Sequence, residues 1–151
     1  MSDRWRPNAT VAAVICDAEN RFLLVEERNA ETNGPVLNQP AGHLEQGETL
    51  IEAVAREVLE ETRWLACATG YLGVARYEAR NGVTYLRHGF VCEAQREVLE
   101  RSLDAGIIDA RWMTRDEILT SSVPPRSPLV LRAIDAYLAG AVMPLSFVID
   151  D

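Results

Sequence analysis

The sequence predicts a mixed α/β fold, and three observations support this class. Apolar, β-branched runs come first along the chain, and a segment with a complete helix-start signal follows them. Further strand-like runs flank Asn81-Gly82, a pair typical of a tight β-hairpin. Two more helices close the chain. This order predicts a mixed β-sheet sandwiched between α-helices, in one domain that spans residues 1–151.

The first third of the chain predicts a hairpin followed by loops. TVAAVICD (10–17) and RFLLVEER (21–28) are strand-like, and the short segment 18–20 between them predicts a hairpin. Residues 29–37 are polar and contain Asn-Gly-Pro. Residues 38–48, NQPAGHLEQGE, contain two glycines and a proline. We predict both stretches to be loops.

The central helix is predicted over residues 50–61. Thr49 and Glu52 have the spacing of a capping box, in which each side chain binds the other residue's backbone N–H. The interior of the segment contains strong helix formers without Gly or Pro. Strands are predicted at residues 71–79, 83–94 and 107–114.

The C-terminal third predicts two helices. Thr114 and Glu117 repeat the capping box before a short helix at residues 116–121. The last helix is predicted from Ser127-Pro128 to residue 138 or 139, and Gly140 ends it. Proline in the first turn and glycine after the last turn are the usual arrangement.

Composition argues against several classes of function. The net charge of −8 disfavours a nucleic-acid partner, since such partners require basic patches. No apolar run approaches the ~20 residues of a membrane span, and MSDRWRPNAT lacks the apolar core of a signal peptide. The three cysteines, Cys16, Cys67 and Cys92, show no metal-ligand spacing. We therefore expect a cytoplasmic protein with reduced cysteines and no membrane partner.

The central helix carries a face of carboxylates. Glu57, Glu60 and Glu61 lie at i, i+3 and i+4, so they project from one side of the helix. Three adjacent carboxylates repel one another unless a cation lies between them, and oxygen ligands suit Mg²⁺ or Mn²⁺. The same spacing also fits a solvated acidic face. The loop before the helix favours a cation site, because Arg56 is placed to pair with Glu48 and to stiffen the joint between loop and helix.

These residues form a longer pattern. This pattern resembles the signature of the Nudix hydrolases: Gly42 is followed after five residues by Glu48, and after seven more by REVLEE (56–61). Every charged position of that signature is present. The chain departs from it at Arg63, where the family has a glycine that closes the helix, and this departure leaves the geometry of the helix C-terminus open.

The resemblance implies a Nudix fold and Mg²⁺-dependent hydrolysis of a nucleoside diphosphate linked to another group, with Mn²⁺ as a possible substitute. It makes Glu57, Glu60 and Glu61 metal ligands, together with the backbone carbonyl of Ala41 or Gly42. It makes Glu48 and Arg56 the supporting pair. The general base stays open among Glu57, Glu60, Asp104 and Glu93.

Three segments outside the signature resemble a bacterial phosphatase branch of the family. They are NQPAGHLE (38–45), YLRHGFVCE (85–93) and RSPLV (126–130). This similarity implies phosphate release from nucleoside tri- and diphosphates and from thiamine-pathway pyrophosphates. The alternatives are a pyrophosphatase for ADP-ribose or dinucleoside polyphosphates and a non-catalytic nucleotide-sensing domain. Both a monomer and a homodimer remain open.

Candidate substrate contacts lie outside the helix. Arginine forks bind phosphate oxygens in a planar geometry, and side-chain amides read a base or bind phosphate. Tyr77 and Tyr85 either stack on a substrate ring or pack in the core, and aromatic residues on strands more often pack in the core. The polar candidates are Arg87, Arg126, Asn38 and Gln39.

Overall fold

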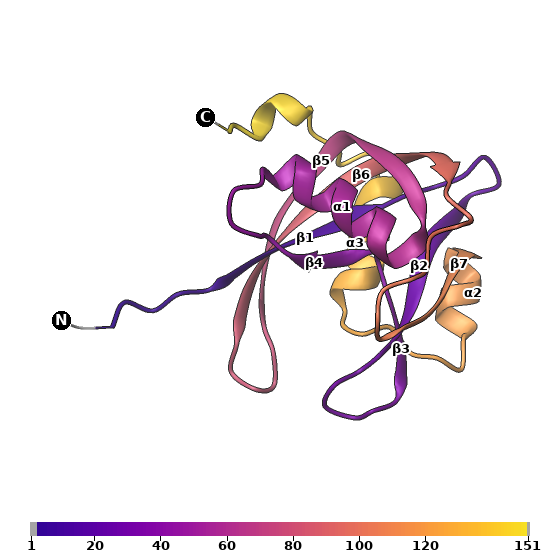
Figure 1. The fold of residues 1–151 in the computed structure, drawn as a ribbon, viewed down its shortest axis with the longest axis horizontal. Helices are drawn as coiled ribbons and strands as arrows, with labels where there is room; N and C mark the ends of the chain where they lie inside the picture. The colour runs from indigo at the N-terminus through magenta and orange to yellow at the C-terminus, as the bar shows by residue number, and fades with distance from the viewer. Residues whose placement is uncertain (1–2, 151) are drawn as a thin grey trace.

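A computed structural model describes residues 3–150 of the protein (Figure 1). Over these residues the fold consists of two sheets and three α-helices, and a 3₁₀ helix, η1, lies near the C-terminus. In chain order the elements are β1 (Asn8–Val14), β2 (Arg21–Arg28), β3 (Pro35–Asn38), β4 (Ala41–His43), α1 (Leu50–Thr62), β5 (Trp64–Glu78), β6 (Thr84–Glu97), β7 (Ile107–Thr114), α2 (Arg115–Thr120), α3 (Leu129–Leu138) and η1 (Leu145–Phe147).

The larger sheet is mixed, as predicted. Its strand order is β4-β1-β6-β5, in which β1 runs parallel to β6 and the other neighbours are antiparallel. The smaller sheet has the order β3-β2-β7 and is antiparallel throughout. The predicted α/β class is confirmed, while the division of the strands between two sheets was not predicted.

Helices cover both faces of the larger sheet. Successive residues of β1 point to opposite sides, so each face presents apolar side chains against which a helix packs. Val11 and Ala13 pack with Val54 and Val58 of α1 in one core. Val14 packs with residues of α2 and α3 in a second core. The first core holds α1 against the sheet and thereby sets the direction in which its remaining faces point.

Capping positions α1 at both ends. At the N-terminus, Thr49 and Glu52 form the predicted capping box. At the C-terminus, Arg63 adopts a left-handed conformation, with φ 66°, and its N–H donates to the Leu59 carbonyl at 2.9 Å. The arginine therefore keeps the cap geometry that glycine would provide.

Both stretches that we predicted as loops contain a short strand. β3 takes up the last three residues of the stretch 29–37, and Asn38 after it, by pairing with β2; β4 forms within residues 38–48 by pairing with β1. β4 contains Gly42 and directly follows Pro40, so its composition gives no strand signal. Only pairing with β1, which lies much earlier in the sequence, makes the residues of β4 extended.

Two further predictions about strands were incomplete. The turn at residues 18–20 forms, but β1 and β2 then separate into different sheets and share only the Cys16–Phe22 bridge. β5 begins at Trp64 rather than at residue 71. The sequence did not predict the first part of this strand, because register shifts such as that between Ala68 and Gly70 interrupt the alternation of apolar and polar residues. Within residues 3–150, no helix has the length and apolar character needed to cross a membrane.

Candidate active site

The site lies where the edge strand β4 meets α1. A side chain at Gly42 would collide with the carboxylate of Glu57, so only glycine lets the helix carboxylate approach the strand this closely. Glu57 is buried, and burial raises the pKa of its carboxyl group despite the Arg56 hydrogen bond that lowers it. This contact places the first predicted ligand at the strand edge.

Arg56 joins the loop to the carboxylate face. Its Nη2 and Nε donate to Glu48 at 2.7 and 3.0 Å, and Nη2 also donates to the His43 carbonyl at 3.0 Å. Its Nη1 donates to Glu57 at 2.8 Å and to Glu60 at 3.2 Å. The Arg56 hydrogen bond lowers the pKa of Glu48. The predicted supporting pair is therefore present geometrically.

Glu61 is buried, as Glu57 is, but it points to a different partner. Its Oε2 accepts a hydrogen bond from the Ala41 N–H at 3.1 Å. Burial raises the pKa of Glu61 to about 8, and the negative charges of Glu27, Glu57 and Asp104 add to this effect. Within residues 3–150, no cationic side chain donates a hydrogen bond to Glu61.

The donor set fits a hard divalent cation. Within the described residues, no three acidic, His or Cys side chains form a ready-made metal cage, since Arg56 binds Glu57 and Glu60 while Glu61 turns to Ala41. A cation would nevertheless offset the cost of the buried, repelling carboxylates. All of the available donors are oxygens, which Mg²⁺ and Mn²⁺ prefer.

The backbone of β4 favours Ala41 over Gly42 as the additional ligand. In an antiparallel pair, each residue directs both its N–H and its carbonyl either toward the partner strand or away from it. The N–H of Ala41 points to Glu61 of α1, so its carbonyl also points away from β1. Ala41 thus offers a backbone oxygen on the side of the carboxylates.

The two outlying candidates for the general base differ in position. Asp104 lies beside the helix, because its N–H donates to the Glu60 carbonyl at 3.0 Å and its charge contributes to the raised pKa values of Glu57 and Glu61. Glu93 is exposed and follows the buried Cys92, so it points away from the core that α1 covers. The structure therefore keeps Asp104 near the site and separates Glu93 from it.

The four predicted polar contacts form one hydrogen-bonded network. Arg87 Nη2 donates to Gln39 at 2.7 Å and to Asn38 at 3.2 Å. Asn38 and Arg126 both donate to the same oxygen of Glu27, at 3.2 and 2.7 Å. Burial lowers the pKa of Arg87 to about 10.

Glu27 is the member of this network that we did not predict. It ends the apolar run of β2 beside Glu26, and the two adjacent glutamates look alike in the sequence. In the structure Glu26 pairs with Arg111 at 3.2 Å, while Glu27 pairs with Arg126, ninety-nine residues along the chain. The strand alternation predicts opposite faces for the two glutamates but names no partner.

Two adjoining cavities lead outward from β4. The inner one, of about 180 Å³, is lined by Ala41 and Gly42 of β4 and by Arg87 and Arg126. The outer one, of about 870 Å³, lies between the β2–β3 loop, the tip of the β5–β6 hairpin and the segment before α3. Four residues line both cavities: Tyr77, Tyr85, Arg126 and Ser127.

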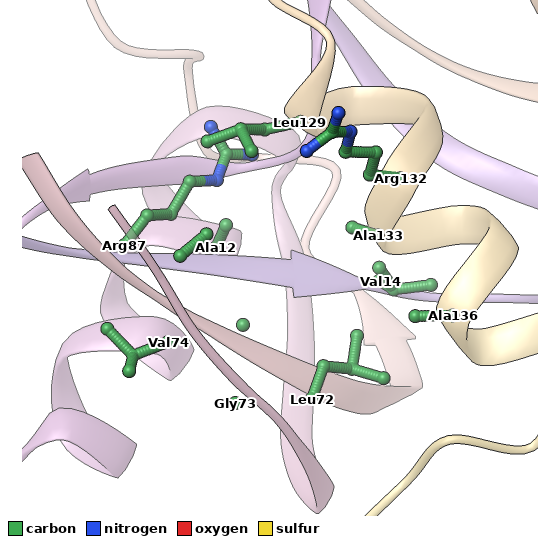
Figure 2. A pocket seen from close by; sticks show the side chains of 12 residues that line it. Ala12, Val14, Leu72, Gly73, Val74, Arg87, Leu129, Arg132, Ala133 and Ala136 are labelled. Atoms are coloured by element: carbon green, nitrogen blue, oxygen red, sulfur yellow. The ribbon is translucent and has the colours of Figure 1, made fainter. Parts of the chain in front are cut away.

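A third hollow, which we call the α3 groove, lies behind Arg87. It has a volume of about 170 Å³ and is walled by β1, β5, β6 and α3. Figure 2 shows Arg87, Leu129 and Arg132 close together at one end of the groove and Leu72 and Val74 across it. Its lining is mainly apolar, whereas polar side chains such as Glu27, Asn38 and Arg126 line the inner cavity.

This fold and this helix signature define the class of the protein. The model of the NUDIX domain matches residues 6–133, and the chain belongs to this family. It is therefore a hydrolase that acts on acid anhydrides in phosphorus-containing compounds.

Named relatives narrow the comparison. The phosphatase NudJ of Escherichia coli K12 is 40% identical over 147 residues, which cover 97% of this chain and 93% of NudJ. A NUDIX hydrolase from Nitrosomonas europaea has a TM-score of 0.91 and 42% identity, covering 97% of this chain and 98% of its own. The MutT protein from Methanosarcina mazei Go1, with a TM-score of 0.69 and 24% identity, shares the fold; the alignment covers 91% and 98% of the two chains.

Proposed function

We propose that the protein is a Mg²⁺-dependent phosphohydrolase that releases phosphate from nucleoside tri- and diphosphates. Mn²⁺ is the expected substitute cation, and thiamine-pathway pyrophosphates are further candidate substrates. The observation that carries this proposal is that Ala41 and Gly42, which touch the α1 carboxylates, also line the cavity that contains Arg87 and Arg126. The phosphatase name of the NudJ relatives supports it.

Each residue of the site has a distinct role in this proposal. Glu57, Glu60, Glu61 and the Ala41 carbonyl would hold the cation. When bound, that cation neutralises phosphate charge and lowers the pKa of a water molecule. Arg56 and Glu48 keep the helix face in register with β4. Either Asp104 or one of the helix carboxylates accepts the proton.

The arginine-lined cavity would hold the phosphate chain. Arg87 uses Nη2 for Asn38 and Gln39, which fixes the plane of its guanidinium group. Arg126 is held by Glu27 at the junction of the two cavities. Planar donor forks at such positions bind phosphate oxygens in a defined orientation. We further propose that the chain acts as a single catalytic domain in the cytoplasm on small molecules.

The deciding experiment measures the release of orthophosphate from GTP, GDP, thiamine pyrophosphate and ADP-ribose, with Mg²⁺ or with EDTA. The wild type should release phosphate from the first three only when Mg²⁺ is present. Glu57→Gln should lower this rate by about a hundredfold, because it removes a ligand charge at the buried contact with β4. Glu93→Gln is the matched control and should leave the rate unchanged.

The other outcomes separate the alternatives. Cleavage of ADP-ribose to AMP, without turnover of the first three compounds, would make the protein a pyrophosphatase and contradict the proposal. Nucleotide binding without turnover of any compound would contradict it in favour of a sensing domain. Phosphate release that persists in EDTA would rule out the role given to the cation.

A further inference from the structure

Tyr77 and Tyr85 form an aromatic pair across the β5–β6 hairpin. They are direct partners in the register of the two strands, so their side chains stand on the same face. Tyr85 is two residues before Arg87 on β6 and therefore shares the face of that arginine. Neither tyrosine belongs to the two core clusters of the described residues, and both line the inner and the outer cavity. The two tyrosines are therefore cavity-lining residues and not core residues.

The pair has a fixed position relative to the carboxylates. The ring of Tyr85 meets the ring of His43 edge to face, with 6.1 Å between the ring centroids. His43 follows Gly42 on β4, and its carbonyl accepts the hydrogen bond from Arg56. A group that rests on Tyr85 therefore lies at a defined distance from the helix that carries Glu57.

The sizes of the two cavities suit two different parts of one substrate. The inner cavity, of about 180 Å³, is below the usual size of a site for a whole small molecule, whereas the outer cavity, of about 870 Å³, is within it. Figure 1 shows that the β5–β6 hairpin tip and the β2–β3 loop project from the same side of the molecule. The tyrosines lie where the inner cavity opens into the outer one.

We propose that the Tyr77–Tyr85 pair is the platform on which the planar ring of a nucleotide stacks while its phosphates reach the carboxylates through the inner cavity. This inference rests on the proposed function and adds a selectivity to it. The site takes anhydrides that carry a ring in preference to inorganic polyphosphate, because stacking on an aromatic face supplies binding free energy that a bare phosphate chain lacks.

The test compares a substrate that has a ring with an anion that has none. Steady-state kinetics with GTP and the inhibition constant of inorganic tripolyphosphate are measured for Tyr77→Leu and Tyr85→Leu. Each variant should raise the KM for GTP about tenfold and leave kcat within about threefold, since stacking is lost while the carboxylates are untouched. The inhibition constant of tripolyphosphate should not change. The Tyr→Phe variants keep the ring and should retain the wild-type KM.

Two control variants change residues near the tyrosine pair and in the α3 groove. Arg76→Gln changes a neighbouring exposed residue of β5 that pairs with Glu78, and it should behave like the wild type. Ala136→Met narrows the α3 groove and should also leave the KM for GTP unchanged. A selective rise in KM for Ala136→Met, without one for the tyrosine variants, would place the ring in the α3 groove and overturn the inference.

The remaining outcomes keep the inference separate from the proposed function. Equal weakening of GTP and tripolyphosphate would show that the tyrosines shape the phosphate site, and this would overturn the stacking role. If the wild type turns over no substrate, the proposed function fails, and the same variants are compared by their dissociation constants for GTP. Loss of GTP binding in the Leu variants, with tripolyphosphate binding retained, would then still support the platform.

Discussion

Gly42 shows how one missing side chain brings a strand and a helix into chemical contact. The Glu57 carboxylate occupies the space where a Cβ at residue 42 would lie. Gly42 also pairs with Val11 in the sheet, so the strand cannot move away without breaking its pairing with β1. The helix carboxylate and the backbone oxygen of the preceding Ala41 are therefore held on the same side of β4.

Gly42→Ala should displace the Glu57 carboxylate and weaken the binding of the cation. We expect a loss of at least about tenfold in apparent Mg²⁺ affinity and in turnover, because a displaced ligand no longer meets the geometry that the cation requires. Mg²⁺ titrations followed by thermal shift and by phosphate release measure both. An unchanged affinity in a folded variant would show that Glu57 binds no cation or tolerates the displacement.

At the scale of an element, α1 combines regular capping with one unusual residue. The capping box at Thr49 follows the sequence rules, whereas Arg63 holds a left-handed conformation that costs most residues about 1–2 kcal/mol. Arg63 also pairs with Glu97 of β6 at 3.1 Å, and both side chains are partly exposed. A pair of this kind contributes at most about 1 kcal/mol, so it offsets the conformational cost only in part.

Two substitutions at Arg63 separate the backbone effect from the ion pair. Arg63→Ala loses the pair and keeps the strained conformation, whereas Arg63→Gly loses the pair and relieves the strain. We expect the free energy of unfolding of the glycine variant to exceed that of the alanine variant by about 1 kcal/mol. Urea denaturation measures this difference, and Glu97→Gln serves as the control for the pair alone. Equal stabilities of the two variants would contradict a left-handed residue 63.

At the scale of the whole molecule, the site contains a conflict between folding and function. Glu61 is buried beside other carboxylates, and burial raises its pKa to about 8 from an ordinary value of 4.5. The unfolded chain therefore releases this proton at lower pH than the folded protein does. Without a cation, the contribution of Glu61 to the free energy of unfolding falls as the pH rises from about 4.5 to about 8.

Glu61→Gln should consequently stabilise the metal-free protein at pH 8. We expect a gain of at least about 1.4 kcal/mol over the wild type, the equivalent of one pKa unit, and this gain should disappear near pH 4.5. Thermal or urea unfolding in EDTA at several pH values measures it. Added Mg²⁺ should stabilise the wild type more than the variant. A variant that is less stable than the wild type at pH 8 in EDTA would contradict this account of Glu61.

Local signals predicted the elements that depend on nearby residues. Both capping boxes, the β5–β6 turn at Asn81-Gly82 and the strand at residues 107–114 lie where the sequence places them. The spacing of Glu57, Glu60 and Glu61 predicted a common helix face, and the proximity of Glu48 and Arg56 follows from their positions around the first turns of α1. These features arise from hydrogen bonds and side-chain geometry within about eight residues.

Residues distant in the sequence decided the features that local signals did not predict. β4 is a strand only because β1 lies beside it, and Glu27 differs from Glu26 only because Arg126 reaches it from the other end of the chain. The sequence alone determined the α/β class, the carboxylate helix and the candidate ligands. The tertiary structure decided the two sheets, the Glu27 network and the cavity in which Arg87 and Arg126 lie beside Ala41 and Gly42 of β4, because hydrogen-bond partners far apart in the chain leave no mark in local spacing.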